Sequence, residues 1–427
     1  MLELDDRDRA LLAGEGGPAA ALAMRLVVRL AEVQDATGLI DVESAHIDAC
    51  LYHGHAGLEF AERLASEGGR VAVPTTLNVS SLDLLHPDLV RSAPDEQRAG
   101  RALMDAYVAM GARPTWTCAP YLLPTARPAF ASHVAWGESN AIVFANAVLG
   151  ARTERYGDFT DIACALTGRA PDVGLHRDEH RVAKLVVDAR SVTGGRVGAE
   201  LVPVLVGHLV GDRVGTRVAA ILGLEDSDED GLRQLGAAAA SSGAVGLFHA
   251  VGATPEAPTL AAAFGEDAAT ARAAEAAAIV LTDDDLDLAL ADLRHDTGRP
   301  FVGASVGTPH ASLAEVRRLA TLVSGRTVHP DVELAVSMGR DVLAELERDG
   351  TLAVLETAGV TVVTDTCTYI VPSLRRADGL YLTNSGKWAY YAPGNIGVDV
   401  ALAPLEVCVE SCVTGRLPAW LSSGPRP

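Results

Sequence analysis

The segment 184-KLVVD-188, together with 201-LVPVLV-206, decides the fold class of this chain. In both segments apolar and β-branched residues run together, which predicts two buried strands. A further short strand is expected at 71–73, where Pro74 ends it. Amphipathic helical patterns occupy four segments: 18–34, 58–66, 97–111 and 139–150. Alternating strands and helices predict an α/β protein whose mostly parallel sheets are flanked by helices.

The composition agrees with this fold class. Hydrophobic residues make up 48% of the 427 residues but aromatic residues only 4%, so Ala, Val and Leu must form most of the core, as in helices packed on buried parallel sheets. The chain is too long for one ordinary core. We expect an N-terminal α/β domain with substrate-site motifs, an Ala- and Asp-rich structural α/β domain, and a C-terminal α/β domain with cluster and substrate motifs, at 1–221, 222–298 and 299–427.

Charge and hydropathy exclude several classes of partner. The net charge of −21 would repel a phosphate backbone, so we expect no nucleic-acid binding. The N-terminus is acidic and lacks the apolar stretch of a signal peptide. The longest uncharged run, 234–255, is interrupted by serines, a histidine and glycines, so we expect no membrane span and a soluble cytoplasmic protein. Six cysteines in such a compartment are expected to be thiols.

Three of these cysteines are candidates for metal ligands. Cys118 and Cys367 lie in two motifs typical of loops, 117-TCAPY-121 and 365-DTC-367, and Cys408 follows further on. Thiolates are soft ligands that iron–sulfur clusters and zinc prefer. None of the three lies in a CxxC pair, and a buried cysteine that packs as a small hydrophobe is the ordinary alternative. Cys408 and Cys412 share one face of an expected helix, 406–415.

Four further residues are candidates for proton transfer or anion binding. His46 and His310 lie at turn-like positions, and histidine is the usual acid or base near neutral pH. Glu138 precedes an expected helix, where it is either a functional carboxylate or a first-turn acid. Lys387 follows 384-NSG-386, a loop that could present N–H groups and an ammonium to an anion. The alternatives are a structural histidine and an exposed turn lysine.

Taken together, these motifs resemble those of the catalytic (large) subunit of aconitase X, a branch of the aconitase superfamily. The resemblance runs in order along nearly the whole chain and is specific only as a set. The matching segments are 46–48, 74–78, 117–121, 136–155, 168–169, Pro171, 174–176, 309–310, 365–367, 384–387 and 391–393.

The resemblance implies a dehydratase that acts on a small β-hydroxy acid and holds an iron–sulfur cluster through three cysteines. It also implies a small swivelling domain that completes the active site; none is obvious in this chain, so we expect a small partner subunit. Cys118, Cys367 and Cys408 would bind the metal, and His46, Glu138, His310 and Lys387 would be catalytic. The expected substrate-binding residues are Thr75, Asn78, Tyr121, Ser139, Asn140, Arg152 and Ser385.

Two positions depart from the family pattern. Thr308, in 307-GTPH-310, stands where a cysteine is expected, and Glu154 stands where an asparagine is expected. If the expected cysteine binds the cluster, the cluster of this protein is altered, replaced or absent. An acid at position 154 would repel a phosphate or carboxylate.

Several functions therefore stay open at this point. The leading hypothesis is a hydro-lyase acting on cis-3-hydroxy-L-proline, with iron as Lewis acid. A phosphomevalonate-type dehydratase is the alternative substrate class, and a cluster-free, non-catalytic subunit of a larger complex is the alternative function. Acyl chemistry with Cys118 or Cys367 as nucleophile ranks last, because no nucleophile-elbow motif supports it.

Overall fold

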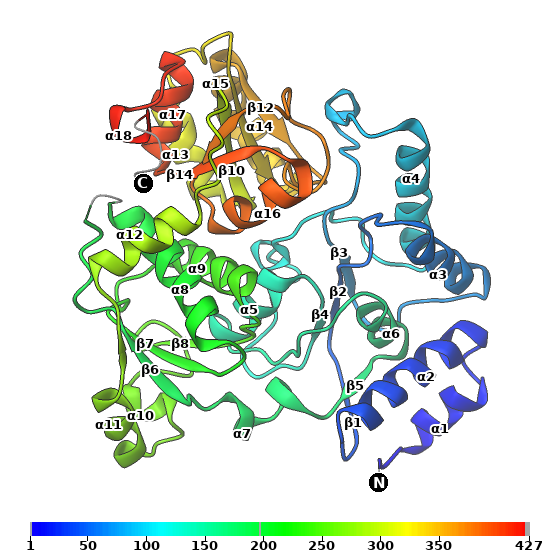
Figure 1. The fold of residues 1–427 in the computed structure, drawn as a ribbon. Coiled ribbons are helices and arrows are strands. Elements are labelled where there is room, and N and C mark those ends of the chain that lie inside the picture. The colour runs from blue at the N-terminus through cyan, green and yellow to red at the C-terminus, as the bar shows by residue number, and fades with distance from the viewer. Residues whose placement is uncertain (1, 196–197, 423–427) are drawn as a thin grey trace.

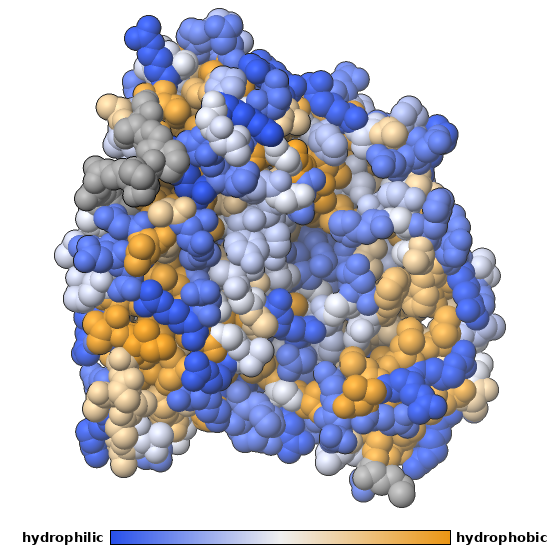
Figure 2. Space-filling view, in the orientation of Figure 1, coloured by the Kyte–Doolittle hydropathy of each residue, from blue (hydrophilic) through white to orange (hydrophobic). Residues whose placement is uncertain are grey.

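The computed structural model describes residues 2–195 and 198–422. It confirms an α/β protein with mostly parallel sheets flanked by helices (Figure 1). Within these residues the sheets have five, four, three and two strands, and only the two-stranded sheet is antiparallel. Polar and charged side chains cover much of the face shown in Figure 2. Within the described residues, no helix has the length and apolar character to cross a membrane.

The first part of the chain is built on a small parallel sheet in the order β3-β2-β4. Its strands are β2 (Ala45–Ile47), β3 (Thr75–Leu77) and β4 (Ala135–Trp136). A separate antiparallel pair joins β1 (Leu39–Asp41) to β5 (Arg169–Pro171). The helices around them are α1 (Asp6–Ala13), α2 (Pro18–Val33), α3 (His55–Ser66), α4 (Pro94–Ala109), α5 (Ser139–Ala147) and α6 (Thr160–Thr167).

The second part is built on a parallel sheet in the order β8-β7-β6-β9. Its strands are β6 (Leu185–Asp188), β7 (Ala219–Leu222), β8 (Phe248–Ala250) and β9 (Ile279–Val280). Its helices are α7 (Asp178–Arg181), α8 (Val202–Val214), α9 (Glu229–Ser242), α10 (Leu260–Ala263), α11 (Ala268–Ala276) and α12 (Asp283–Asp292). The domain boundary expected between residues 221 and 222 crosses this sheet.

The third part holds the five-stranded parallel sheet, in the order β12-β11-β10-β13-β14. Its strands are β10 (Phe301–Ala311), β11 (Glu333–Met338), β12 (Val360–Val363), β13 (Leu380–Thr383) and β14 (Asp399–Leu402). Its helices are α13 (Leu313–Val323), α14 (Arg340–Asp349), α15 (Thr351–Ala358), α16 (Gly386–Ile396), α17 (Leu405–Thr414) and α18 (Ala419–Ser422).

Two expected strands are wrong. The segment 201–206 is not a strand, because it turns into α8, which has Pro203 in its first turn and buried residues over most of its length. Such a helix belongs in a core, and α8 packs closely on α9 and also on α12. The segment 71–73 is not a strand either; the strand β3 begins after Pro74.

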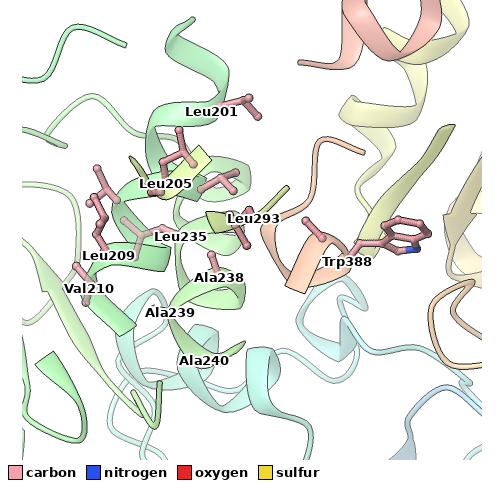
Figure 3. Close-up of a cluster of buried hydrophobic side chains, with 14 of the residues drawn as sticks. Leu201, Leu205, Leu209, Val210, Leu235, Ala238, Ala239, Ala240, Leu293 and Trp388 are labelled. Atoms are coloured by element: carbon pink, nitrogen blue, oxygen red, sulfur yellow. The ribbon is translucent and has the colours of Figure 1, made fainter. Parts of the chain in front are cut away.

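A hydrophobic core joins the second part of the chain to α16. It includes Leu205 and Leu235 from α8 and α9, and Trp388 from α16 (Figure 3). A Cβ atom added to Gly386 would lie 2.8 Å from Val204 and 3.1 Å from Ala238. Glycine therefore permits the close approach of α16 to α8 and α9. This contact fixes the first turn of α16, which carries Lys387.

Candidate functional site

Two loops from opposite ends of the chain bring a pair of thiols together. Cys118 lies just before a short 3-10 helix (Pro120–Leu122), and Cys367 lies beyond the end of β12. Their Sγ atoms are 3.8 Å apart and both side chains are buried. His310, near the end of β10, completes a group whose ligand atoms all lie within 4.8 Å of one another. In the parts of the chain that the structure describes, this is the one such group.

The two thiols titrate as a pair. Burial raises the pKa of Cys118, but the hydrogen bond from Cys367 and the charges of His310 and Lys387 together bring it down to about 6. The hydrogen bond with Cys118 and burial raise the pKa of Cys367 well above its ordinary value. One thiolate beside one thiol is the state that follows, and thiolates are the form that binds soft metal ions.

His310 is fixed by its surroundings. Its backbone N–H donates to the Sγ atom of Cys118 at 3.2 Å. Its Nδ1 atom lies 3.1 Å from the hydroxyl of Thr117, and its Nε2 atom lies 3.1 Å from the carbonyl oxygen of Thr366. Because a carbonyl can only accept, Nε2 carries a proton. The imidazole thus has both nitrogens engaged beside the thiol pair.

Cys408 does not join this group. It lies on α17, as expected, but its thiol donates to the carbonyl oxygen of Ala403 at 3.5 Å within the core of the third part. Cys412 lies one turn further on, in the same core, and donates to the carbonyl oxygen of Glu333. Burial raises the pKa of Cys408 well above its ordinary value. Its packing is that of a buried small hydrophobe.

A buried ion pair joins α16 to α5 beside the thiols. The Nζ atom of Lys387 donates to Oε1 of Glu138, and both side chains are almost completely buried. Burial lowers the pKa of Lys387, but the carboxylate of Glu138 outweighs it, so the pKa lies well above its ordinary value. Glu138 caps α5 by accepting from the N–H of Ala141 at 3.2 Å and has a positive φ of 51°. Such a backbone conformation is costly for a residue other than glycine and is common at functional sites.

Amide and hydroxyl groups surround this ion pair. The Nδ2 group of Asn140 donates to Glu138 and to the carbonyl oxygen of Cys118, the latter at 3.1 Å. The hydroxyl of Tyr121 donates to Oδ1 of Asn140 at 2.6 Å. Ser139 lies 3.5 Å from Nζ of Lys387 and is only half-buried. The structure therefore places five of the expected site residues in one network with the thiols.

His46 lies on β2, two residues before Asp48. It is fully buried, and its Nδ1 atom lies 2.8 Å from the hydroxyl of Thr76. Burial lowers its pKa to about 3, so the imidazole is neutral. Asn78 donates through Nδ2 to Asp48, a half-buried carboxylate that our sequence reasoning did not single out. The matching segment 46–48 already contained this aspartate, at the carboxyl end of a parallel strand, where ligand sites gather.

Three expected substrate-binding residues have other partners. Arg152 forms ion pairs with Asp178 and with Glu256, the latter at 3.4 Å. The hydroxyl of Thr75 donates to the carbonyl oxygen of Val73 at 2.8 Å, and that of Ser385 caps α16 by accepting from Trp388 at 3.1 Å. The structure thus supports a structural role for each.

The two departures from the family pattern also have clear surroundings. Glu154 accepts from the N–H of Leu175 at 2.9 Å and so lies among the residues after β5. Thr308 is buried, and its Oγ1 atom has no hydrogen-bond partner. A buried hydroxyl without a partner is costly and calls for an explanation. Thr308 stands two residues before His310, whose N–H reaches Cys118, so it lies close to the candidate metal site.

The fold and this network define a class of protein: a multidomain α/β enzyme with soft metal-ligand side chains and a buried Lys–Glu pair where its domains meet. Comparison with known families matches residues 1–179, 183–290 and 303–414 to the first, second and third domains of aconitase X, respectively. The chain belongs to the aconitase X family.

Known relatives agree along nearly the whole chain. It is 46% identical to a cis-3-hydroxy-L-proline dehydratase of Pseudomonas aeruginosa over 98% of this chain and 72% of that protein. It is 34% identical to a phosphomevalonate dehydratase large subunit of Methanothermobacter thermautotrophicus over 93% and 95%, respectively. The crystal structure of Thermococcus kodakaraensis aconitase X in its holo-form superposes with a TM-score of 0.82 at 30% identity, covering 96% of this chain and all of the other. This protein is accordingly a hydro-lyase.

Proposed function

We propose that this protein removes water from cis-3-hydroxy-L-proline. The observation that carries the proposal is the 46% identity to a dehydratase of that substrate over 98% of the chain. The site supports it, because Lys387 supplies one cation for one carboxylate, whereas Arg152, the second expected anion-binding residue, is held by Asp178 and Glu256. A phosphorylated acid would need more positive charge than this site offers.

The residues present fit a metal group held by thiolates. Cys118 and Cys367 would hold an iron–sulfur group, and Thr308, whose buried hydroxyl has no partner, stands where the family pattern has a cysteine. Cys408 is left in its own core. When bound, such a group supplies a Lewis acid that helps a hydroxyl group depart.

The protein's own side chains bind the substrate and move its proton. The substrate carboxylate takes the place of Glu138 at Nζ of Lys387, with the hydroxyl of Ser139 beside it. This exchange frees Oε1 of Glu138, whose pKa is raised by burial, to accept the proton from C2. The electron pair of the C2–H bond forms a C2=C3 double bond as the C3–O bond breaks, and the departing hydroxide takes up the proton carried by Glu138, so that water leaves and the carboxylate is restored. His310 and the Tyr121–Asn140 pair keep the thiols and Glu138 in place.

We further propose that a smaller polypeptide completes the site. Two observations support it: the archaeal relatives are large subunits, and this chain spans 72% and 71% of two hydroxyproline dehydratases. The half-buried Ser139 and Asp48 would lie under that second part.

The test is an activity measurement on anaerobically reconstituted protein. The part of the Pseudomonas aeruginosa relative that this chain does not cover is supplied as a separate polypeptide. We expect dehydration of cis-3-hydroxy-L-proline and none of mevalonate 5-phosphate. Proton NMR would show the dehydration as loss of the signal of the hydrogen on C3, the carbon that bears the hydroxyl group. Turnover of the phosphorylated acid alone would contradict the proposed substrate, and no turnover of either by iron-loaded protein would contradict the proposed function.

A further inference from the structure

Asp48 lies against the loop that carries Glu138, the ion-pair partner of Lys387. It follows β2 directly and is half-buried, whereas Cys118, Glu138 and Lys387 are buried. Its carboxylate is close enough for its charge to act on Glu138, and for the charges of Lys387 and Cys118 to act on it. A side chain that is partly exposed among buried catalytic groups is placed to touch a substrate.

The surroundings of Asp48 fix the backbone that carries it. Its backbone N–H donates to Oδ2 of Asp161 at 2.7 Å, and the N–H of Ala49 donates to the same oxygen at 3.3 Å. A Cβ atom added to Gly137 would lie 2.9 Å from the Cβ of Asp48 and 3.0 Å from Asp161. Glycine at 137 therefore lets the loop that carries Glu138 pass directly against Asp48.

Asn78 then leaves one carboxylate oxygen of Asp48 available. Its Nδ2 group donates to Oδ1 of Asp48, and no hydrogen bond among the described residues uses Oδ2. The Asn78 side chain is 2% exposed, and its Oδ1 atom has no hydrogen-bond partner. The imidazole of His46, two residues before Asp48, is fully buried, and its Nδ1 atom lies 2.8 Å from the hydroxyl of Thr76.

The charges on the two sides of the site are opposite. Asp48 has two further aspartates near it, Asp158 and Asp161, while Lys387, in the first turn of α16, is a cation whose charge acts on Asp48. A proline-type amino acid carries an anion and a cation on neighbouring atoms, its carboxylate and its ring ammonium. A site that holds the carboxylate at Lys387 therefore needs an acceptor for the ammonium a few ångströms away.

We propose that Asp48, oriented by Asn78, accepts hydrogen bonds from the ring ammonium of the substrate. The inference rests on the proposed function and names the group that recognises the nitrogen atom. It assigns Asp48 to substrate binding and selection for an amino acid, with proton removal left to Glu138. A hydroxy acid that has no ammonium would leave the Asp48 carboxylate without a partner.

The test compares two ligands that differ at one ring atom, L-proline and tetrahydrofuran-2-carboxylate, by calorimetry on iron-loaded protein with its completing polypeptide. The unaltered protein should bind L-proline about 10- to 100-fold more tightly, as expected for one charge-assisted contact. Asp48→Asn should bring the two affinities within about threefold of each other. For cis-3-hydroxy-L-proline the KM should rise by a similar factor while kcat changes far less.

Asp158→Asn is the matched control. It removes an exposed carboxylate whose charge also acts on Asp48, and it should keep the preference for L-proline. Equal affinity of the unaltered protein for both ligands would overturn the inference without any variant. A preference for L-proline that survives in a folded Asp48→Asn protein would also overturn it. These binding results are independent of turnover, so a failure of the proposed dehydration is seen separately.

Discussion

Two pairs of buried cysteines in this molecule have opposite surroundings. Cys118 and Cys367 come from loops 249 positions apart and meet with their Sγ atoms at 3.8 Å. Cys408 and Cys412 lie one turn apart on α17 and each donates to a backbone carbonyl. All four are free and buried, so burial does not distinguish the pairs.

The charged groups around each pair make the difference. Burial alone would raise the pKa of Cys118, but the hydrogen bond from Cys367 and the charges of His310 and Lys387 bring it down to about 6. Around Cys412 burial dominates and raises the pKa. A functional thiol is therefore recognised by its neighbours, because a low dielectric penalises a thiolate unless a cation or donor is at hand.

The largest expected effect is a difference in activity between substitutions in the two cysteine pairs. Cys367→Ser removes a proposed ligand and should lower kcat/KM by about a thousandfold, since a Lewis acid contributes several kcal/mol. Cys408→Ala should leave kcat/KM within about threefold and lower the free energy of unfolding by about 1–2 kcal/mol. Steady-state kinetics and denaturant unfolding measure both. A Cys408→Ala protein that folds but is inactive would contradict the distinction.

The next largest effect should come from breaking the Glu138–Lys387 ion pair, and it should appear in the stability of the protein. Lys387→Met leaves Glu138 buried without its cation and should cost about 3–5 kcal/mol of stability. The double variant Glu138→Gln/Lys387→Met removes both charges and should recover much of that loss while staying inactive. Thermal unfolding of the two single variants and the double variant measures the coupling. Additive losses would show that the two charges act independently.

The acidic side of the site should respond to pH within the working range. Burial and the charge of Asp158 raise the pKa of Asp48 to about 6, with Lys387 and Asn78 acting in the opposite direction. Asp48 is ionised above that pH and loses its charge as pH falls through it. The preference for L-proline over tetrahydrofuran-2-carboxylate should therefore fall about tenfold between pH 7 and pH 5. A preference that does not change over this range would contradict the assignment.

The smallest effect concerns the third ligand position. Thr308→Val keeps the shape of the side chain and removes a buried hydroxyl that has no protein partner. In metal-free protein it should raise the free energy of unfolding by about 1 kcal/mol. Urea unfolding of the metal-free proteins measures this difference. A loss of stability would show that the hydroxyl has a partner, such as an ordered water molecule.

Sequence patterns predicted much of the fold. Four helical patterns appear as α2, α3, α4 and α5, and 184–188 contains β6. The segment 201–206 was wrong because a short apolar run fits a buried helix and a buried strand equally well, and only the packing of α8 on α9 and α12 decides.

The site was predicted in part, and the reason lies in how it is assembled. Distinctive loop motifs contain four of the candidate residues, and the structure brings these four together: Cys118, Cys367, Glu138 and Lys387. Cys408 was grouped with them because its residue type suits a metal, but sequence spacing does not show that it lies within the core of the third part. Asp48 was overlooked since its role depends on Gly137 and Asp161, which no local pattern connects to it.

The most direct test of the account is the iron and acid-labile sulfide content of anaerobically purified protein. The account predicts stoichiometric iron and sulfide in the unaltered protein and in Cys408→Ala, and loss of both in Cys367→Ser. Unaltered protein that stays free of iron after anaerobic reconstitution, or Cys367→Ser protein that retains it, would contradict the claim that the Cys118–Cys367 pair is the metal site.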